Sequence, residues 1–368
     1  MKKIGLILGV ALVGVLVAVT YHLFENAVHG AISLVWYDWF NTSENRIFVL
    51  PLAITISVIF FGLQHYLDAK SESHQEHGLG EMPAPNLVNF AKVLLIGFFS
   101  LLAGASLGPE AILVPACMIV GGMVGQRLVG SGEKSEPVVK LFSAAGIMAL
   151  FTAFFNSAFV GVLSLLLVMR QAKVKFQPIL LVVALISSIA SYYTLQLIEA
   201  EVYAPLPEYN WSLTLNTVFI SVLLLGIGYV LVVAMDKVIR LFQNVREYSA
   251  FSVWWVRGLL AGGVLGALYL AGGPLVEFTG NLSIQPLFAD AASIGLGGLL
   301  LILVAKIVAI GWSKAIGYRG GMIFPTIFLA AVVVAIIQVF VKDYNLIYGM
   351  IAVIIGALAA NKKNHTLV

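Results

Sequence analysis

The sequence predicts an all-α integral membrane protein, and three observations support this prediction. Of the 368 residues, 60% are hydrophobic and only 11% are charged, and the mean hydropathy is +0.99. A soluble domain carries about a quarter charged residues, because its surface has to be covered with polar groups. The apolar residues form long runs, and a backbone in lipid must satisfy its own hydrogen bonds, which favours helices. The lipid bilayer is therefore the main expected partner of this chain.

A series of apolar segments accounts for most of the chain. A bilayer core about 30 Å thick needs about 20 helical residues for each crossing. Several segments are shorter than this or lie only a few residues from the next one, which predicts broken and re-entrant helices beside complete spans. The apolar segments are residues 4–36, 47–67, 86–103, 109–128, 138–155, 157–169, 177–198, 211–235, 252–271, 291–311, 322–341 and 346–360.

Charged residues near these segments predict the orientation of the chain. Lys2 and Lys3 precede the first apolar run, and no small-x-small cleavage site follows it, so we expect an uncleaved first helix with a cytoplasmic N-terminus. The linker at 170–175 is basic and the linker at 199–208 is acidic, as expected for loops on opposite sides of a membrane. We therefore predict a multi-pass protein of the cell membrane.

The sequence offers little for metals, cofactors or nucleic acid. In the polar stretch 68–86, His74 and His77 lie among acidic residues, and a solvated charged loop is favoured over a metal site. Cys117 is the only cysteine, so no intrachain disulfide is possible. No basic stripe with interleaved aromatic residues is found, which argues against nucleic-acid binding. We predict no metal and no cofactor.

Two apolar segments are interrupted in a way that ordinary spans are not. GASLGPEAILVPA at 104–116 and GYRGGMIFPTIFLAA at 317–331 each end one helix with Gly and Pro and begin another. Such a break leaves a helix N-terminus at membrane depth, where unpaired N–H groups and the helix dipole attract an anion. Paired interruptions in two halves of a chain indicate a transport site.

Three charged residues accompany these breaks, and each has alternative interpretations. Glu110 lies inside the first break, where it could gate a pathway, cap its own helix or pair with Lys306. Lys306 could snorkel, pair with an acid or add positive potential to a pathway. Arg319 could raise the local anion concentration or belong to a plain cytoplasmic loop.

With these residues, the sequence resembles the CLC family of chloride channels and proton-coupled chloride transporters. The family motif G-[KR]-E-G-P has a counterpart at 108–112, with Pro109 in the variable place, as in some prokaryotic members. The motif G-x-F-x-P has a counterpart at 321–325, and F-N-x-P-x-x-G has one that starts at Phe155 and ends at Gly161. The resemblance covers about residues 45 to 345.

The resemblance implies an inverted repeat of tilted and broken helices, with pseudo-repeats at about 45–170 and 211–345. It also implies a homodimer with one anion path in each subunit. Glu110 would be the gate, a carboxylate that leaves the outer anion site when it is protonated or displaced. The residues that the resemblance assigns to anion binding, mainly through their backbone N–H groups, are Gly108, Ala111, Ile112, Gly321, Met322, Ile323 and Phe324.

The sequence also departs from the family pattern. Pro109 removes one N–H donor, and the nearest counterpart of G-S-G-I-P, at 78–82, lacks the serine hydroxyl. No acid stands at 167–170, where proton-coupled members carry an inner glutamate. The chain stops before the family's last helices, and Tyr344 and Tyr348 come too early to replace the anion-binding tyrosine, which predicts a C-terminally shortened member.

We therefore predict a passive channel or uniporter for a small inorganic anion, with chloride as the expected anion and Glu110 as the gate. The alternatives are a proton-coupled chloride antiporter and an impaired or structural membrane subunit without transport. An intramembrane enzyme is the least favoured class, because the sequence has no convergent catalytic set, H-E-x-x-H motif or phosphate loop. We treat residues 1–368 as a single transmembrane domain without a soluble regulatory domain.

Overall fold

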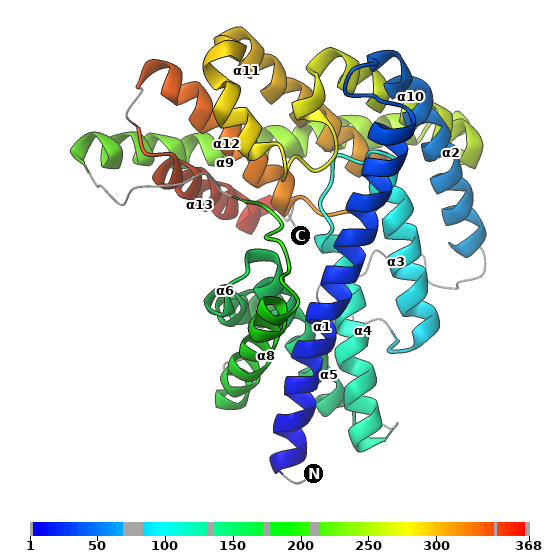
Figure 1. Cartoon of the computed structure of the whole chain (residues 1–368), viewed down its shortest axis with the longest axis vertical. Helices are drawn as coiled ribbons and strands as arrows, with labels where there is room; N and C mark the ends of the chain where they lie inside the picture. The colour runs from blue at the N-terminus through cyan, green and yellow to red at the C-terminus, as the bar shows by residue number, and fades with distance from the viewer. Residues whose placement is uncertain are drawn as a thin grey trace. The chain divides into compact units, whose positions relative to one another are not determined.

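The computed structural model is built from helices joined by short loops (Figure 1). No β-strand occurs among the residues it describes, where the only extended pairing is an isolated antiparallel bridge between Gly108 and Gly321. The structure describes all residues except 1–2, 69–83, 131–134, 172–174, 176, 206–213, 342–343 and 365–368.

Each predicted apolar segment contains a helix, and the segment at 157–169 contains two short ones. Around them lie single-turn pieces, such as the π-helix Ser33–Trp39 that continues α1. The α-helices are α1 (Lys3–Ile32), α2 (Val49–Asp68), α3 (Leu87–Leu102), α4 (Glu110–Val129), α5 (Glu136–Phe155), α6 (Ala158–Leu163), α7 (Leu165–Gln171), α8 (Pro178–Leu197), α9 (Leu215–Arg246), α10 (Trp254–Gly272), α11 (Ile284–Ile316), α12 (Ile323–Phe340) and α13 (Leu346–Asn364).

Local sequence signals explain where several helices begin. Thr214 precedes α9, and its side chain accepts a hydrogen bond from the Thr217 N–H at 3.2 Å, which satisfies one of the unpaired donors of the first turn. Ser157 caps α6 in the same way. Pro178 opens α8, where its missing N–H costs nothing.

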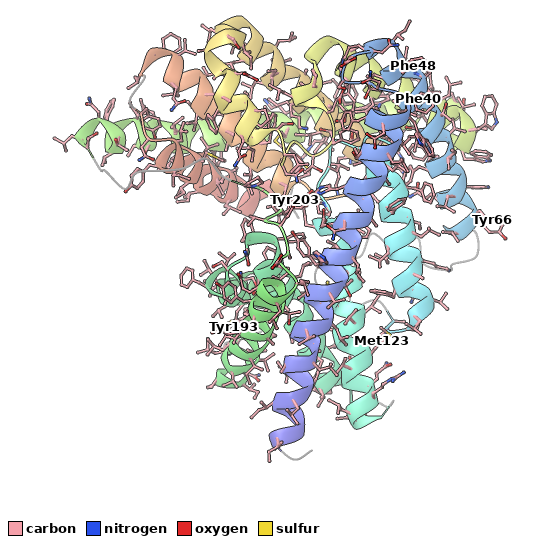
Figure 2. The ribbon with its side chains drawn as sticks, in the orientation of Figure 1. Phe40, Phe48, Tyr66, Met123, Tyr193 and Tyr203 are labelled. Atoms are coloured by element: carbon pink, nitrogen blue, oxygen red, sulfur yellow. The ribbon has the colours of Figure 1, made fainter. Side chains whose placement is uncertain are left out.

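The helices have the length and composition of membrane spans. Nine of the described helical stretches are long and apolar enough to cross a membrane, and α3 and part of α13 are shorter apolar helices. Large apolar side chains such as Leu197, Leu215 and Phe219 are exposed on the helix surfaces, as expected where lipid is the solvent. Figure 2 shows two exposed aromatic residues of this kind, Tyr66 near the end of α2 and Tyr193 on α8. The protein is a multi-pass membrane protein.

The chain forms two compact units that alternate along the sequence. The first comprises Met1–Gly30, Ser71–Phe98 and Ala111–Tyr203, and the second comprises Ala31–Lys70, Phe99–Glu110 and Ala204–Val368. The pseudo-repeat boundaries and the single transmembrane domain inferred from the sequence stay predictions.

In the first unit, α5 packs against α6 and α8, and it also lies close to α4. A Cβ atom on Gly146 would collide with the backbone carbonyl of Cys117, and the Ser143 hydroxyl donates to the Met118 carbonyl at 2.8 Å. Small residues therefore let the two backbones approach, and a hydroxyl adds a hydrogen bond between them.

In the second unit, α2 and α10 run side by side, as do α9 and α13 (Figure 1). The contact between α2 and α10 follows three glycines four residues apart, Gly258, Gly262 and Gly266. A Cβ on Gly262 would stand 2.6 Å from the Ile54 Cα, so glycine is needed for this close approach. Two further glycines allow α9 and α13 to approach in the same way, Gly228 and Gly356.

Two helices extend furthest beyond their predicted bounds. The segment predicted at 291–311 lies in α11, which begins at Ile284 and contains a non-helical residue, Gly295, at φ +67°. Hydropathy did not predict the first part of α11, because polar residues such as Gln285 and Asp290 lie within that part of the helix. The helix predicted at 211–235 continues to Arg246 for the same reason, since its last turns are amphipathic and charged.

Candidate functional site

The first break separates α3 from α4. Regular helix ends at Leu102, and Gly104 adopts φ +90°, a conformation that favours glycine. The backbone groups of the break are bound by other parts of the second unit. Trp36 Nε1 donates to the Leu102 carbonyl at 2.9 Å, the Tyr269 hydroxyl donates to the Gly104 carbonyl, and Thr279 Oγ1 donates to the Leu107 carbonyl at 2.7 Å. This irregular backbone is thus buried in protein, as a membrane requires.

The second break separates α11 from α12 and is fixed in a similar way. Gly317 ends α11 with φ +104°. The Ser100 hydroxyl both accepts from the Arg319 N–H and donates to the Arg319 carbonyl, each at 2.8 Å. The Tyr318 hydroxyl lies 2.5 Å from Ser57 Oγ, and burial raises the pKa of Tyr318. Arg319 is therefore anchored through its backbone.

The two breaks lie side by side. Gly108 N–H donates to the Gly321 carbonyl at 2.8 Å, and Gly321 N–H donates to the Gly108 carbonyl at 2.7 Å. This antiparallel bridge joins residues that are more than two hundred positions apart in the sequence. The structure thus brings together the two interrupted segments in which the sequence predicted a transport site.

Glu110 places its carboxylate on the N-terminus of α12. Its Oε1 atom accepts hydrogen bonds from the N–H groups of Ile323 at 2.5 Å and Phe324 at 3.4 Å. The preceding residue, Met322, offers no side-chain cap, and Pro325 has no N–H. Glu110 is 4% exposed. The buried carboxyl group of Glu110 therefore occupies the positive end of α12, the kind of place where a free anion binds.

The other carboxylate oxygen of Glu110 lies in a cradle of glycine backbone. Oε2 is buried, and no hydrogen bond reaches it among the described residues. A Cβ atom on Gly108 would collide with Oε2, and one on Gly321 would collide with the Glu110 side chain. The carboxylate fits only because both neighbours are glycines. One carboxyl oxygen thus has two N–H partners, and the other has no hydrogen-bond partner among the described residues.

The pairing of Glu110 with Lys306, one alternative from the sequence, is wrong. Lys306 is fully buried in α11, and its ammonium donates to the carbonyls of Val276, Glu277 and Phe278. It therefore does not snorkel either.

The remaining predicted residues have different environments. Ala111 and Ile112 follow Glu110 as the second and third residues of α4, where Ala111 is exposed and Ile112 is buried against Gly97. Their role in anion binding stays a prediction, as do those of Gly108, Gly321 and Met322. Tyr344 is buried and its hydroxyl lies 2.9 Å from Ser221 Oγ. His74, His77 and the 78–82 counterpart of G-S-G-I-P lie outside the described residues.

Reasoning from the sequence missed the residues that anchor the first break, Trp36, Tyr269 and Thr279. Each is a single polar side chain in or beside an apolar segment, and its partner lies far away in the sequence. Tyr269 and Gly104, for example, are 165 positions apart. A lone buried tyrosine or threonine was the only available signal, and it does not identify a partner.

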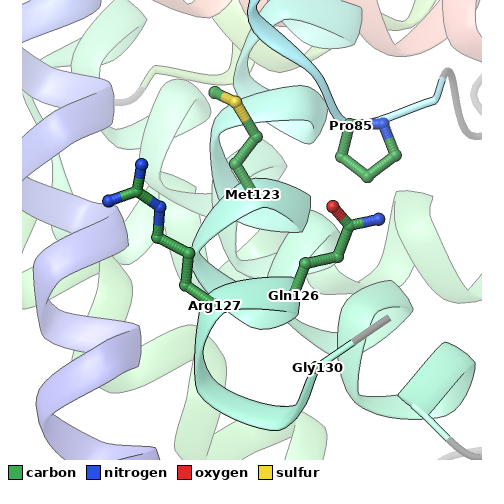
Figure 3. A pocket seen from close by; sticks show the side chains of 5 residues that line it. All are labelled: Pro85, Met123, Gln126, Arg127 and Gly130. Carbon is green, nitrogen blue, oxygen red and sulfur yellow. The ribbon is translucent and has the colours of Figure 1, made fainter. Parts of the chain in front are cut away.

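A surface pocket lies elsewhere, in the first unit, and Figure 3 shows its lining. Met123, Gln126 and Arg127 reach it from α4, with Pro85 and Gly130 at its edges. None of the predicted site residues lines it. We therefore place the candidate functional site at the paired breaks.

Fold and site together define a class, that of multi-pass membrane proteins in which two broken helices meet inside a helical bundle. A family model described as "Voltage gated chloride channel" matches residues 69–361. The chain therefore belongs to the voltage gated chloride channel (CLC) family, which the sequence motifs had indicated.

A short segment of the chain also matches individual proteins. Over 72 residues, which is 20% of this chain, it is 38% identical to "Putative ion-transport protein YfeO" of Salmonella newport (strain SL254) and of Salmonella agona (strain SL483). The matched segment spans only 17% of the length of these relatives.

Solved structures match over nearly the whole chain. A CLC-type fluoride/proton antiporter aligns with a TM-score of 0.70 and 17% identity, over 96% of this chain and 86% of its own. A slow cyanobacterial Cl⁻/H⁺ antiporter aligns with a TM-score of 0.72 and 18% identity, over 97% and 85% of the two chains. At these identities the likeness concerns the fold.

Proposed function

We propose that this protein moves small inorganic anions across a membrane, with Glu110 as the gate and chloride as the expected anion. The observation that carries this proposal is the position of the Glu110 carboxylate on the first N–H groups of α12. Those N–H groups and the helix dipole favour a negative charge, and the Glu110 carboxyl group lies on them.

The gating mechanism follows from competition for these donors. An ionised Glu110 holds the Ile323 and Phe324 N–H groups and excludes an anion from them. Protonation removes the negative charge that the dipole stabilises, so the neutral side chain is free to leave. An arriving anion at high concentration can displace it as well. Either event opens the N-terminus of α12 to the transported ion.

A passive channel or uniporter is our first choice over a coupled antiporter. The sequence has no acid at 167–170, where the family's inner proton acceptor would stand. The antiporter is the second candidate, because two structural neighbours are described as fluoride/proton and Cl⁻/H⁺ antiporters. Glu110 itself could carry a proton in that mechanism. The same neighbours make fluoride the alternative anion.

The proposal also covers the oligomeric state of the protein, its membrane and its orientation. A homodimer with one pathway in each subunit, the cell membrane as location and a cytoplasmic N-terminus are proposed from the family resemblance and the loop charges. A non-transporting structural subunit remains the alternative to be tested. An enzymatic role is not proposed, since the family consists of channels and transporters.

Anion efflux from liposomes that contain the purified protein tests the proposal. We expect chloride efflux to rise as the pH falls in the wild type, and to be fast and independent of pH in Glu110→Ala. A suitable control is Glu136→Gln, which changes another glutamate at a helix start, one that is exposed and paired with Lys140 at 2.6 Å. This control should behave as the wild type.

Three results decide between the candidates. Proton movement driven by a chloride gradient would replace the uniporter by the antiporter. Fluoride efflux without chloride efflux would replace the expected anion. Absence of any anion efflux from folded wild-type protein, and from Glu110→Ala, would refute anion transport.

A further inference from the structure

The ammonium group of Lys306 lies in a closed cage in the second unit. It donates hydrogen bonds to the carbonyls of Phe278 at 2.5 Å, Val276 at 3.1 Å and Glu277 at 3.5 Å. The ring of Phe328 covers it, with Nζ 5.1 Å from the ring centroid. A fully buried cation is costly unless each of its donors has a partner. Three successive carbonyls and an aromatic face provide those partners here.

The loop that supplies these carbonyls has an unfavourable backbone conformation. Phe278 adopts φ +52°, which is uncommon for a residue other than glycine, and Gly280 adopts φ +90°. Three neighbouring carbonyl dipoles that point at one place would repel one another without a cation between them. Lys306 therefore supplies the charge that makes this loop conformation favourable.

The same loop is hydrogen-bonded to the first break at two places, once directly and once through Tyr269. Thr279 Oγ1 donates to the Leu107 carbonyl at 2.7 Å. The Tyr269 hydroxyl accepts from the Phe278 N–H at 3.2 Å and donates to the Gly104 carbonyl. Leu107 and Gly104 mark the two ends of the irregular stretch that leads into Glu110. The position of the gate therefore depends on the shape of the loop.

A second cation, the partly buried Arg46, supports the loop from its other side. Arg46 forms an ion pair with Glu277 at 2.6 Å, and it also donates to the Tyr269 carbonyl at 2.7 Å. Burial raises the pKa of Glu277, and the Arg46 guanidinium opposes this effect. Arg46 and Lys306 thus share one acid in this cluster. The three hydrogen bonds that the Lys306 ammonium donates go to backbone carbonyls of the loop, which ties its charge to the loop conformation.

We propose that Lys306 is a positioning residue for the gate. Its ammonium group holds residues 276–279 in the shape that clamps Gly104 and Leu107, and the clamp fixes Glu110 over the N–H groups of α12. This inference deepens the proposed function and rests on it where transport is concerned. The clamp itself can be tested without transport.

Hydrogen exchange measured by mass spectrometry on the purified protein provides the test that does not depend on transport. We expect Lys306→Met, which removes charge and donors at similar length, to accelerate exchange in 103–108 and 276–280 about tenfold or more. Lys306→Arg keeps the charge and the donors, and should stay closer to the wild type. Unchanged exchange in 103–108 for Lys306→Met would overturn the proposal.

Arg257→Met is the matched control for these measurements. Arg257 is another cation inside an apolar helix of the same unit; it donates to the Phe251 carbonyl at 2.8 Å and lies 5.8 Å from the Phe61 ring centroid. Its hydrogen bond does not involve the break. We expect no acceleration in 103–108 for this variant, and an equal acceleration there would show a general loss of stability, which overturns the proposal.

Thr279→Val keeps the proposal testable if Lys306→Met does not fold. This variant removes only the hydroxyl that donates to Leu107. Both variants should flatten the pH dependence of chloride efflux toward that of Glu110→Ala. Accelerated exchange in Lys306→Met, combined with no efflux from the wild type, would support the clamp and refute only transport. A wild-type pH profile in both folded variants would overturn the positioning role.

Discussion

Gly321→Ala is a substitution that should move the gate without disturbing the fold. The three atoms nearest to a Cβ placed on Gly321 all belong to the Glu110 side chain, and Cγ and Cδ are closer to it than Oε1, which is at 2.5 Å. Contacts shorter than 3.0 Å are not tolerated, so one group has to shift. The Glu110 carboxylate is the flexible end of a side chain, and it can move while the backbone stays in place.

The size of the effect follows from the contacts that are lost. The carboxylate accepts two N–H groups of α12, and a hydrogen bond to a charged group contributes about 1.5–3 kcal/mol. If the displacement weakens these two hydrogen bonds by about 2 kcal/mol in total, the ratio of open to closed conformations of Glu110 would rise about 30-fold. Anion efflux at neutral pH should then approach that of Glu110→Ala.

A double-mutant cycle with Glu110→Ala isolates this effect. Glu110→Ala removes the three atoms with which the added methyl group would collide. Gly321→Ala should therefore change efflux little in that background. Gly263→Ala, where a Cβ would meet only the Ile54 Cδ1 atom at 4.0 Å, is the control. The reasoning is refuted if Gly321→Ala keeps the wild-type pH profile, or if it abolishes efflux in the Glu110→Ala background.

Three further predictions concern stability, measured by thermal unfolding in detergent. Tyr269→Phe leaves the Gly104 carbonyl and the Phe278 N–H without their partner and should cost about 1–3 kcal/mol, so an unchanged Tm would contradict the anchoring role. Gly262→Leu should cost at least about 1–3 kcal/mol, because its side chain enters the backbone of α2, whereas Gly263→Leu should be tolerated. Burial raises the pKa of Glu277 in the folded state above its value in the unfolded chain. Between these two pKa values the unfolded chain loses this proton more readily, so the stability of the folded state falls as the pH rises. The Tm of Glu277→Gln relative to the wild type should therefore increase with pH, and a decrease would reverse the inferred direction.

The helices and the positions of the two breaks could be predicted from the sequence alone. Hydropathy and the placement of Gly and Pro are local properties, and they act within one or two helical turns. For that reason the first break was found between α3 and α4, and the second between α11 and α12. The family followed from the same stretches, since its motifs at 108–112 and 321–325 lie in the breaks.

Only the tertiary structure decided which polar groups meet. The sequence left Glu110 with three alternatives, and the structure places its carboxylate on the N–H groups of a helix 213 residues later. It likewise gives the Lys306 ammonium three backbone carbonyls as hydrogen-bond partners. A buried charge has to find partners wherever packing brings them, and packing joins segments that are distant in sequence. Residue type and spacing therefore show that a partner is needed, while the fold determines which group it is.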